Sequence, residues 1–107
     1  MGYGTLYNGI FFSLDQPEGA WNIDVCKGPG NARILKGWTV LGEFSNQHNC
    51  LERCNLQSDM HVLQEKSDVT GCEFKKSTNE CKAHTEPLHP SFGFGTSVCF
   101  IYQKNVT

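Results

Sequence analysis

Apolar and polar residues alternate in short runs near the start of the chain, and these runs predict strands. In "YGTLYNGIFFSL" an Asn-Gly pair separates two runs of aromatic and apolar residues. Such a pair suits a two-residue hairpin loop, because a type I′ turn requires positive φ at both central residues. We therefore expect a hairpin that turns at Asn8-Gly9. Residues 15–36 are rich in turn formers, as in "QPEG" and "KGPGN", and should form an irregular connection.

The stretch "GWTVLGEF", residues 37–44, predicts another strand, with Trp38, Val40 and Gly42 on one face. A tryptophan side chain buries a large area, so we expect Trp38 in the core rather than on a ligand-binding surface. The residues after this strand carry the signals of a helix start.

Ser45 or Asn46 is expected to cap a helix that begins near residue 46 and ends near residue 57. The apolar run that follows, "DMHVL", is short and predicts a strand. The helix carries Cys50 and Cys54 on one face, with Cβ atoms about 5–6 Å apart, whereas a disulfide needs about 3.5–4.5 Å. The two cysteines should therefore not bond to each other. They are free core cysteines, metal ligands or anchors that bond to two different strands.

The segment "GCEFKKSTNECKAH" predicts a second hairpin with its turn in "KSTN". Successive residues of a strand face opposite sides, so Glu73 and Lys75 should face solvent. The inner face of this hairpin should carry Cys72, Phe74, Cys81 and Ala83. "TEPLHPSFGFGTS" follows as a long loop and "VCFIYQK" as a closing strand.

Six cysteines in 107 residues are an even and dense set, which is typical of secreted domains stapled by disulfides. A chain of this length should form one domain whose modest core benefits from cross-links. We therefore expect a secreted, extracellular protein. Six cysteines allow fifteen pairings, and their spacing does not select one.

The spacing of the candidate ligands disfavours a structural zinc site. Zinc sites use closely spaced pairs such as C-x2-4-C and H-x3-5-H. Besides Cys50 and Cys54, only His84 and His89 approach this pattern, and the two prolines of "HTEPLHP" favour an irregular loop with solvated histidines. We expect no metal site and no cofactor.

Charge and hydropathy exclude further classes of partner. Eleven acidic and nine basic residues give a formal charge of −2, so we expect no nucleic-acid partner. The sequence contains no run of about 18 apolar residues, so we expect no membrane insertion. The start "MGYGTLYNGIFF" lacks the basic and uninterrupted apolar regions of a signal peptide.

Several motifs around the cysteines resemble those of a known family. They are the helical C-x3-C, "GCEF", "ECKAHT", the loop sequence "GFG" and the terminal "VCFIY". In these features residues 26–104 resemble a six-cysteine PAN/apple domain. The resemblance implies an α+β fold in which one short helix packs across a curved antiparallel sheet. Residues 1–25 are then an N-terminal extension with an extra hairpin, and residues 26–107 are the PAN/apple-like domain.

The resemblance also implies a disulfide pattern. In the family the helical cysteines bond to two central strands, and a third bridge joins the first cysteine to the last. The implied pairs are Cys26–Cys99, Cys50–Cys81 and Cys54–Cys72. The interval between Cys54 and Cys72 is longer than the family usually has, which leaves a second register open. In that register Met60 takes the place of a family cysteine, Cys50 pairs with Cys72, and Cys54 pairs with Cys81.

Common catalytic motifs are missing from the sequence. G-x-S-x-G, H-E-x-x-H, a P-loop and a dinucleotide fingerprint do not occur. Paired cysteines leave no thiol for a Cys/His nucleophile. Asp24, Asp59 and Asp68 are candidates for the carboxylate pair of a glycosidase, but we interpret them as solvated surface residues. We therefore expect no enzymatic activity.

PAN/apple domains bind proteins or carbohydrates, so the resemblance implies an adhesion or lectin-like recognition module with an extracellular protein or glycan as its partner. A sugar site needs an exposed aromatic ring beside polar groups, and the candidates are Tyr3, Tyr7, Trp21 and Tyr102. For each of them, packing of the extra hairpin onto the sheet is the favoured interpretation.

Two other functional classes and one modification site complete the predictions. The first class is a matrix protein that self-associates as a homo-oligomer through its aromatic, Gly-rich start. The second is a secreted inhibitor of a host protein. Asn105 begins the only N-x-[ST] sequon, "NVT", and is a candidate glycosylation site beyond the last expected strand.

Overall fold

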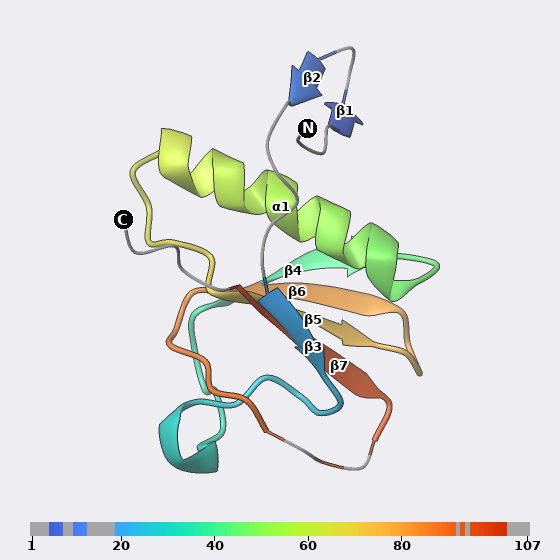
Figure 1. Ribbon diagram of the computed structural model, residues 1–107, viewed down its shortest axis with the longest axis vertical. Helices are drawn as coiled ribbons and strands as arrows, with labels where there is room; N and C mark the ends of the chain where they lie inside the picture. The colour runs from blue at the N-terminus through green and yellow to red at the C-terminus, as the bar shows by residue number, and fades with distance from the viewer. Residues whose placement is uncertain (1–4, 8–9, 13–18, 92, 94, 103–107) are drawn as a thin grey trace.

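Five antiparallel strands form the main sheet, and helix α1 (Gln47–Leu63) packs on it (Figure 1). The computed structural model describes residues 5–7, 10–12, 19–91, 93 and 95–102, with side chains from residue 19 onward. In chain order the strands of this sheet are β3 (Gly19–Asn22), β4 (Trp38–Glu43), β5 (Gly71–Lys75), β6 (Glu80–His84) and β7 (Ser97–Tyr102). Their order across the sheet is β3-β7-β5-β6-β4, so β3 and β4 are the two edges. The α+β fold class expected from the sequence is confirmed.

The two expected hairpins are both present. Strands β1 (Thr5–Tyr7) and β2 (Ile10–Phe12) pair antiparallel across a two-residue connection, as an Asn-Gly hairpin requires. The turn residues themselves, Asn8 and Gly9, lie outside the described residues. Strands β5 and β6 pair antiparallel with the turn in "KSTN", where the sequence places it.

Helix α1 begins where the sequence predicts but ends later. Asn46 is the N-cap, and its side chain accepts a hydrogen bond of 2.9 Å from the backbone N–H of Asn49. The helix continues to Leu63, so the strand expected in "DMHVL" is wrong. The last turn is anchored by the buried His61, whose Nδ1 lies 2.7 Å from the carbonyl oxygen of Ser67. A short apolar run is compatible with a strand and with the end of a helix. In this chain the run is helical, and the contact between His61 and Ser67 holds its last turn.

The core lies between α1 and one face of the sheet. Its buried side chains are Cys50, Leu51, Cys54, Val69, Cys72, Phe74, Cys81, Ala83, Val98 and Phe100. The register of β5, β6 and β7 places all the strand members of this cluster on the same face. The largest fully buried side chains in the described part of the chain are all cysteines. Sulfur therefore occupies the positions that larger apolar side chains occupy in most cores.

The opposite face of the sheet is covered by irregular chain. The connection between β3 and β4 includes a 3-10 turn (Pro29–Asn31), and it runs on the side of the sheet away from α1 (Figure 1). In this connection Cys26 is 3% exposed, and its N–H donates a hydrogen bond of 2.9 Å to Glu73 Oε1 on β5. Glu73 does point away from α1, but that side is not solvent, so the expectation of a solvated Glu73 is wrong. The expectation of a solvated His84 is wrong for the same reason, since His84 is also buried.

Three disulfides join these layers, and the structure describes no free cysteine. On the core side the bridges join α1 to β6 and to β5. On the opposite side the third bridge joins the connection after β3 to β7. The pairs are Cys26–Cys99, Cys50–Cys81 and Cys54–Cys72, which are those that the resemblance implied and not those of the alternative register with Met60. The two helical cysteines bond to different strands, as their spacing allows.

Strand β4 contains a bulge that changes which residues face the helix. Trp38 and Val40 lie opposite residues of β6 that face away from α1. A register shift after Val40 places Gly42 opposite Cys81, which faces α1, so the three residues expected on one face are divided between two. Trp38 is 39% exposed, and the expectation of a core Trp38 is wrong.

Candidate functional site

Two of the four aromatic residues proposed as ligand contacts are used in packing. Trp21 in β3 and Tyr102 in β7 are half-buried, and both meet Phe100 edge-on, with ring centroids 5.2 and 5.4 Å away. Tyr3 lies outside the described residues, and the side chain of Tyr7 in β1 is not described. Trp21 and Tyr102 therefore pack within the main sheet, and the expected packing of the extra hairpin onto the sheet stays a prediction.

The hydroxyl of Tyr102 also has a partner inside the fold. It donates a hydrogen bond of 2.6 Å to Asn55 Oδ1 on α1. Burial, and then the charge of Asp59, raise the pKa of Tyr102 far above its ordinary value. A neutral, hydrogen-bonded tyrosine at this position ties β7 to the helix. The sequon at Asn105 follows β7 outside the described residues.

The three aspartates considered for acid–base chemistry belong to separate segments. Asp24 follows β3, and its Oδ1 accepts a hydrogen bond of 2.8 Å from the backbone N–H of Val25. Asp59 lies on α1, where burial raises its pKa. Asp68 lies in the connection between α1 and β5. These placements give no support to a carboxylate pair.

Among the described side chains, the exposed aromatic ring with polar neighbours is Trp38, on edge strand β4. Lys82 Nζ lies 5.3 Å from the centroid of its ring, a distance typical of a cation–π contact. Lys82 also pairs with Glu80, with 3.6 Å between Nζ and Oε1. Val40, which is 52% exposed, continues the same face along β4. We call Trp38, Val40 and Lys82 the Trp38 surface.

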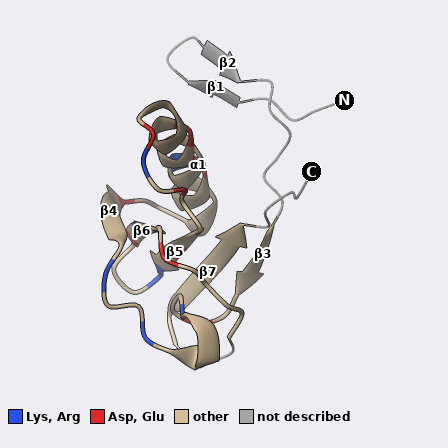
Figure 2. Ribbon diagram, turned by 90° about the vertical axis from the view of Figure 1, so that its left-hand side faces the viewer, with Lys and Arg blue, Asp and Glu red and all other residues tan. Residues whose placement is uncertain are grey.

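The chain just before β4 is fixed next to the Trp38 surface. The carbonyl oxygen of Gly37 accepts hydrogen bonds from the N–H and Oγ1 of Thr85, at 2.7 and 2.9 Å. Gly37 has φ 78°, and a side chain there would meet Thr85 and Glu86, so this position requires glycine. Lys36 lies 3.9 Å from Glu86, between Nζ and Oε1. Basic residues lie along the connection that leads into β4 (Figure 2).

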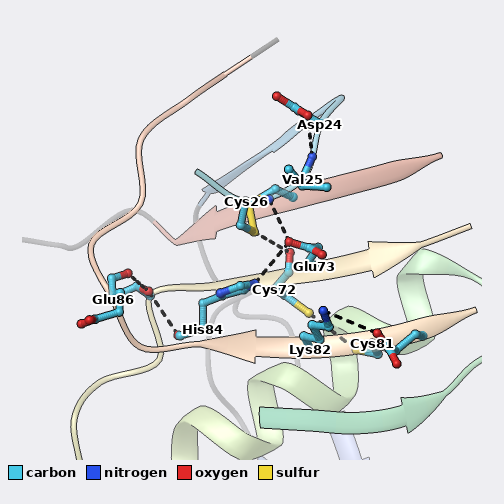
Figure 3. A network of polar contacts seen from close by, with 12 residues as sticks. Asp24, Val25, Cys26, Cys72, Glu73, Cys81, Lys82, His84 and Glu86 are labelled. Atoms are coloured by element: carbon cyan, nitrogen blue, oxygen red, sulfur yellow. Dashed lines mark hydrogen bonds and ion pairs between the residues drawn. A yellow bond between two sulfur atoms is a disulfide. The ribbon is translucent and has the colours of Figure 1, made fainter. Parts of the chain in front are cut away.

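A buried acid–base pair lies behind Trp38. His84 Nε2 is 3.3 Å from Glu73 Oε1, and the His84 ring centroid is 6.3 Å from that of Trp38. This distance is within ion-pair range, but the contact lies outside the geometry of a well-aligned hydrogen bond, and His84 Nδ1 has no hydrogen-bond partner among the described residues. Figure 3 shows the Cys26 amide and His84 converging on the Glu73 carboxylate from two sides.

Opposing effects set the ionisation of Glu73. Burial disfavours its charged form, but the His84 side chain, the Cys26 N–H and the charge of Lys82 favour that form more strongly. The pKa of Glu73 therefore lies below its ordinary value. At neutral pH the carboxylate is ionised, and it holds the Cys26 backbone against β5.

Two clusters of described side chains place metal-binding atoms within 4.8 Å of one another. One contains Cys26, Glu73 and His84. The other contains the four core cysteines, which are Cys50, Cys54, Cys72 and Cys81. While the disulfides are intact, none of these sulfurs is a thiolate, which is the form that binds metals. In the oxidised protein the four core cysteines form two disulfides, and Cys26 is bonded to Cys99 outside its cluster.

Comparisons with protein-family models, with curated proteins and with solved structures found no match to this chain. The PAN/apple assignment therefore remains a proposal based on the cysteine motifs. Among the described helices, none combines the length and the apolar character needed to cross a membrane.

Proposed function

We propose that the protein is an extracellular recognition module of PAN/apple type that binds a carbohydrate through the Trp38 surface. The observation that carries the proposal is the partly exposed indole of Trp38 beside charged groups on a disulfide-anchored sheet. An indole face stacks on the apolar C–H face of a sugar, and polar groups at its rim bind the hydroxyls.

The neighbours of Trp38 have the chemistry that such a ligand needs. Lys82 Nζ supplies donors, and the Glu80 carboxylate supplies acceptors, so a sugar hydroxyl can use both of its hydrogen-bonding functions. The indole rests against His84, which is buried and paired with Glu73, so the ring has a fixed support. A preformed surface loses little conformational entropy when it binds, which favours affinity.

The proposed activity is binding without turnover, and three bridges maintain the surface. Dense cross-linking suits an oxidising compartment, which agrees with an extracellular location. A protein ligand would use the same surface in a different way, with Val40 and Trp38 as apolar anchors.

A glycan array tests the proposal with wild-type protein and three variants of matched circular dichroism spectrum. We expect Trp38→Ala to weaken binding at least about fivefold, because a stacked aromatic contributes about 1 kcal/mol or more. Trp38→Phe should retain part of the affinity. Leu63→Ala, which removes an 84% exposed apolar side chain at the end of α1, should have no effect.

Two results would overturn the proposal. If Trp38→Ala bound glycans as tightly as wild type, the Trp38 surface would not be the binding site. If the wild-type protein bound no glycan, carbohydrate would not be the ligand class.

A further inference from the structure

The four core cysteines form one compact sulfur cluster and not two separate bridges. Cys72 Sγ lies 3.3 Å from Cys50 Sγ and 3.8 Å from Cys81 Sγ, although it is bonded to neither. Cys54 Sγ lies 3.9 Å from Cys81 Sγ. All four residues have 0% exposure. The helix supplies two of the sulfurs, and β5 and β6 supply one each.

These separations are close to those of a tetrahedral metal site. Zinc binds four thiolates at about 2.3 Å, so the sulfurs of such a site lie about 3.8 Å apart. The non-bonded sulfur pairs given above already have separations of 3.3–3.9 Å. The two bonded pairs would have to open, and their Cα atoms are 5.6 and 6.1 Å apart. Rotation about the Cys side-chain bonds can supply that opening without a change of fold.

We propose that the reduced chain binds one Zn²⁺ in this cluster, with Cys50, Cys54, Cys72 and Cys81 as its four ligands. The proposal is independent of the carbohydrate-binding function. Each disulfide takes up two electrons and two protons and becomes two thiols. With a thiol reductant, two thiol molecules supply both and become a disulfide. With a phosphine, phosphorus supplies the electrons, and one water molecule supplies the two protons and the oxygen of the phosphine oxide. Zinc then displaces the thiol protons to solvent.

Helix α1 supplies two of the four ligands from one face. Cys50 lies in the first turn of α1, and its N–H donates to the carbonyl oxygen of Asn46 at the cap. The other helical ligand, Cys54, follows one turn later on the same face, so the helix presents a preformed pair of ligands.

The sequence pattern conceals this site because its ligands are spread over three elements. Zinc motifs are recognised by two closely spaced pairs, but Cys72 and Cys81 are separated by a complete hairpin. Pairing of β5 with β6 brings them together under the helix. The same four residues would then hold the layers together in both redox states, by disulfides in an oxidising compartment and by zinc in a reducing one.

Two double variants that each retain four cysteines provide the test. Cys26→Ser/Cys99→Ser keeps the complete cluster, whereas Cys54→Ser/Cys72→Ser removes half of it and keeps the same number of thiols. The wild-type chain and both variants are reduced with a phosphine under anaerobic conditions and titrated with Zn²⁺ and with Co²⁺. Binding is followed by the absorption bands of tetrahedral Co²⁺–thiolate, and helix content is followed by circular dichroism.

We expect reduced wild-type protein and Cys26→Ser/Cys99→Ser to bind one metal ion with the tetrahedral thiolate spectrum and to gain or keep helix content. Cys54→Ser/Cys72→Ser should bind at least about 100-fold more weakly, because it lacks two of the four ligands. Equal binding by the two variants would indicate that the metal binds to any available thiols and not to the cluster, and it would overturn the proposal. Stronger binding by Cys54→Ser/Cys72→Ser would place the metal at Cys26, Glu73 and His84 instead, and no binding by reduced wild-type protein would exclude the site.

Discussion

Glu73 carries a buried negative charge that several parts of the chain depend on. Its carboxylate accepts the Cys26 N–H and pairs with His84. The folded pKa of Glu73 lies below its ordinary value, so ionisation stabilises the fold at neutral pH. This contribution is fully present above the unfolded-state pKa and is lost as the pH falls through the folded value. Stability should therefore decrease on acidification, in part through this one residue.

Glu73→Gln keeps an acceptor for the Cys26 N–H but removes the charge. We expect it to lower the free energy of unfolding at neutral pH by about 2 kcal/mol, because it leaves the buried His84 without its carboxylate partner. The difference from wild type should shrink in acid. Urea unfolding at about pH 7 and about pH 3 measures both effects.

Glu80→Gln is the matched control, since Glu80 is a more exposed acid that pairs with Lys82 on the same strand, β6. It should change stability by no more than about 0.5 kcal/mol. The buried Glu73–His84 pair would have no energetic role if Glu73→Gln and Glu80→Gln lowered the free energy of unfolding by the same small amount. The same conclusion would follow if the stability of Glu73→Gln depended on pH in the same way as that of wild type.

Single residues show where strand alternation is informative and where it fails. Alternation correctly placed Cys72 and Phe74 toward the helix and Glu73 away from it. It could not show that the Cys26 segment covers the other face, because that contact joins residues far apart in the sequence. For Trp38 the bulge in β4 and the edge position of this strand decided its exposure, and a hydrophobicity pattern contains neither.

At the scale of elements, the N-terminus of α1 depends on one side chain. The Asn46 side chain accepts the Asn49 N–H, one of the backbone donors that a helix start leaves unpaired. Asn46→Ala should therefore lower the free energy of unfolding by about 1 kcal/mol, measured by urea unfolding followed by circular dichroism. In Ser45→Ala, which removes only an exposed contact to the Asn49 side chain, we expect a change close to zero. Equal losses in the two variants would show that Asn46 is not the effective cap.

The two ends of α1 differ in how well the sequence predicts them. Its start follows from local chemistry, because a cap residue acts on donors three residues away. Its end depends on His61, which contacts Ser67 beyond the helix. Met60, Val62 and Leu63 are exposed, so the final turn lacks the apolar face that would have distinguished a helix from a strand.

At the scale of the whole molecule, stability depends on the bridges, because the largest fully buried side chains among the described residues are cysteines. Cys26–Cys99 spans a sequence separation of 73, for which the chain-entropy model gives about 4 kcal/mol. We expect Cys26→Ser/Cys99→Ser to lose about this amount in urea unfolding. Cys26→Ala/Cys99→Ala controls for the buried hydroxyls and should lose a similar amount. A loss below about 1 kcal/mol in both variants would contradict this role of the bridge.

The disulfide pairs were accessible only through the family resemblance. Fifteen pairings are open to six cysteines, and helix geometry excludes only those that join Cys50 to Cys54. The non-bonded approach of Cys50 and Cys72, at 3.3 Å, shows why the alternative register was reasonable. The two pairings differ by small displacements in one cluster, and spacing along the chain does not resolve them.

The antiparallel pairing of β3 with β7 has a consequence for mechanical load. Gly19 lies directly opposite Tyr102, so the chain enters and leaves the sheet at adjacent points (Figure 1). Tension applied to both flanks would pull β3 and β7 apart pair by pair, from Gly19 and Tyr102 toward Asn22 and Cys99. The Cys26–Cys99 bond stands at the end of this path, and it would carry the force covalently. Everything enclosed by that bond, including the Trp38 surface, would then keep its shape while the tether is stretched.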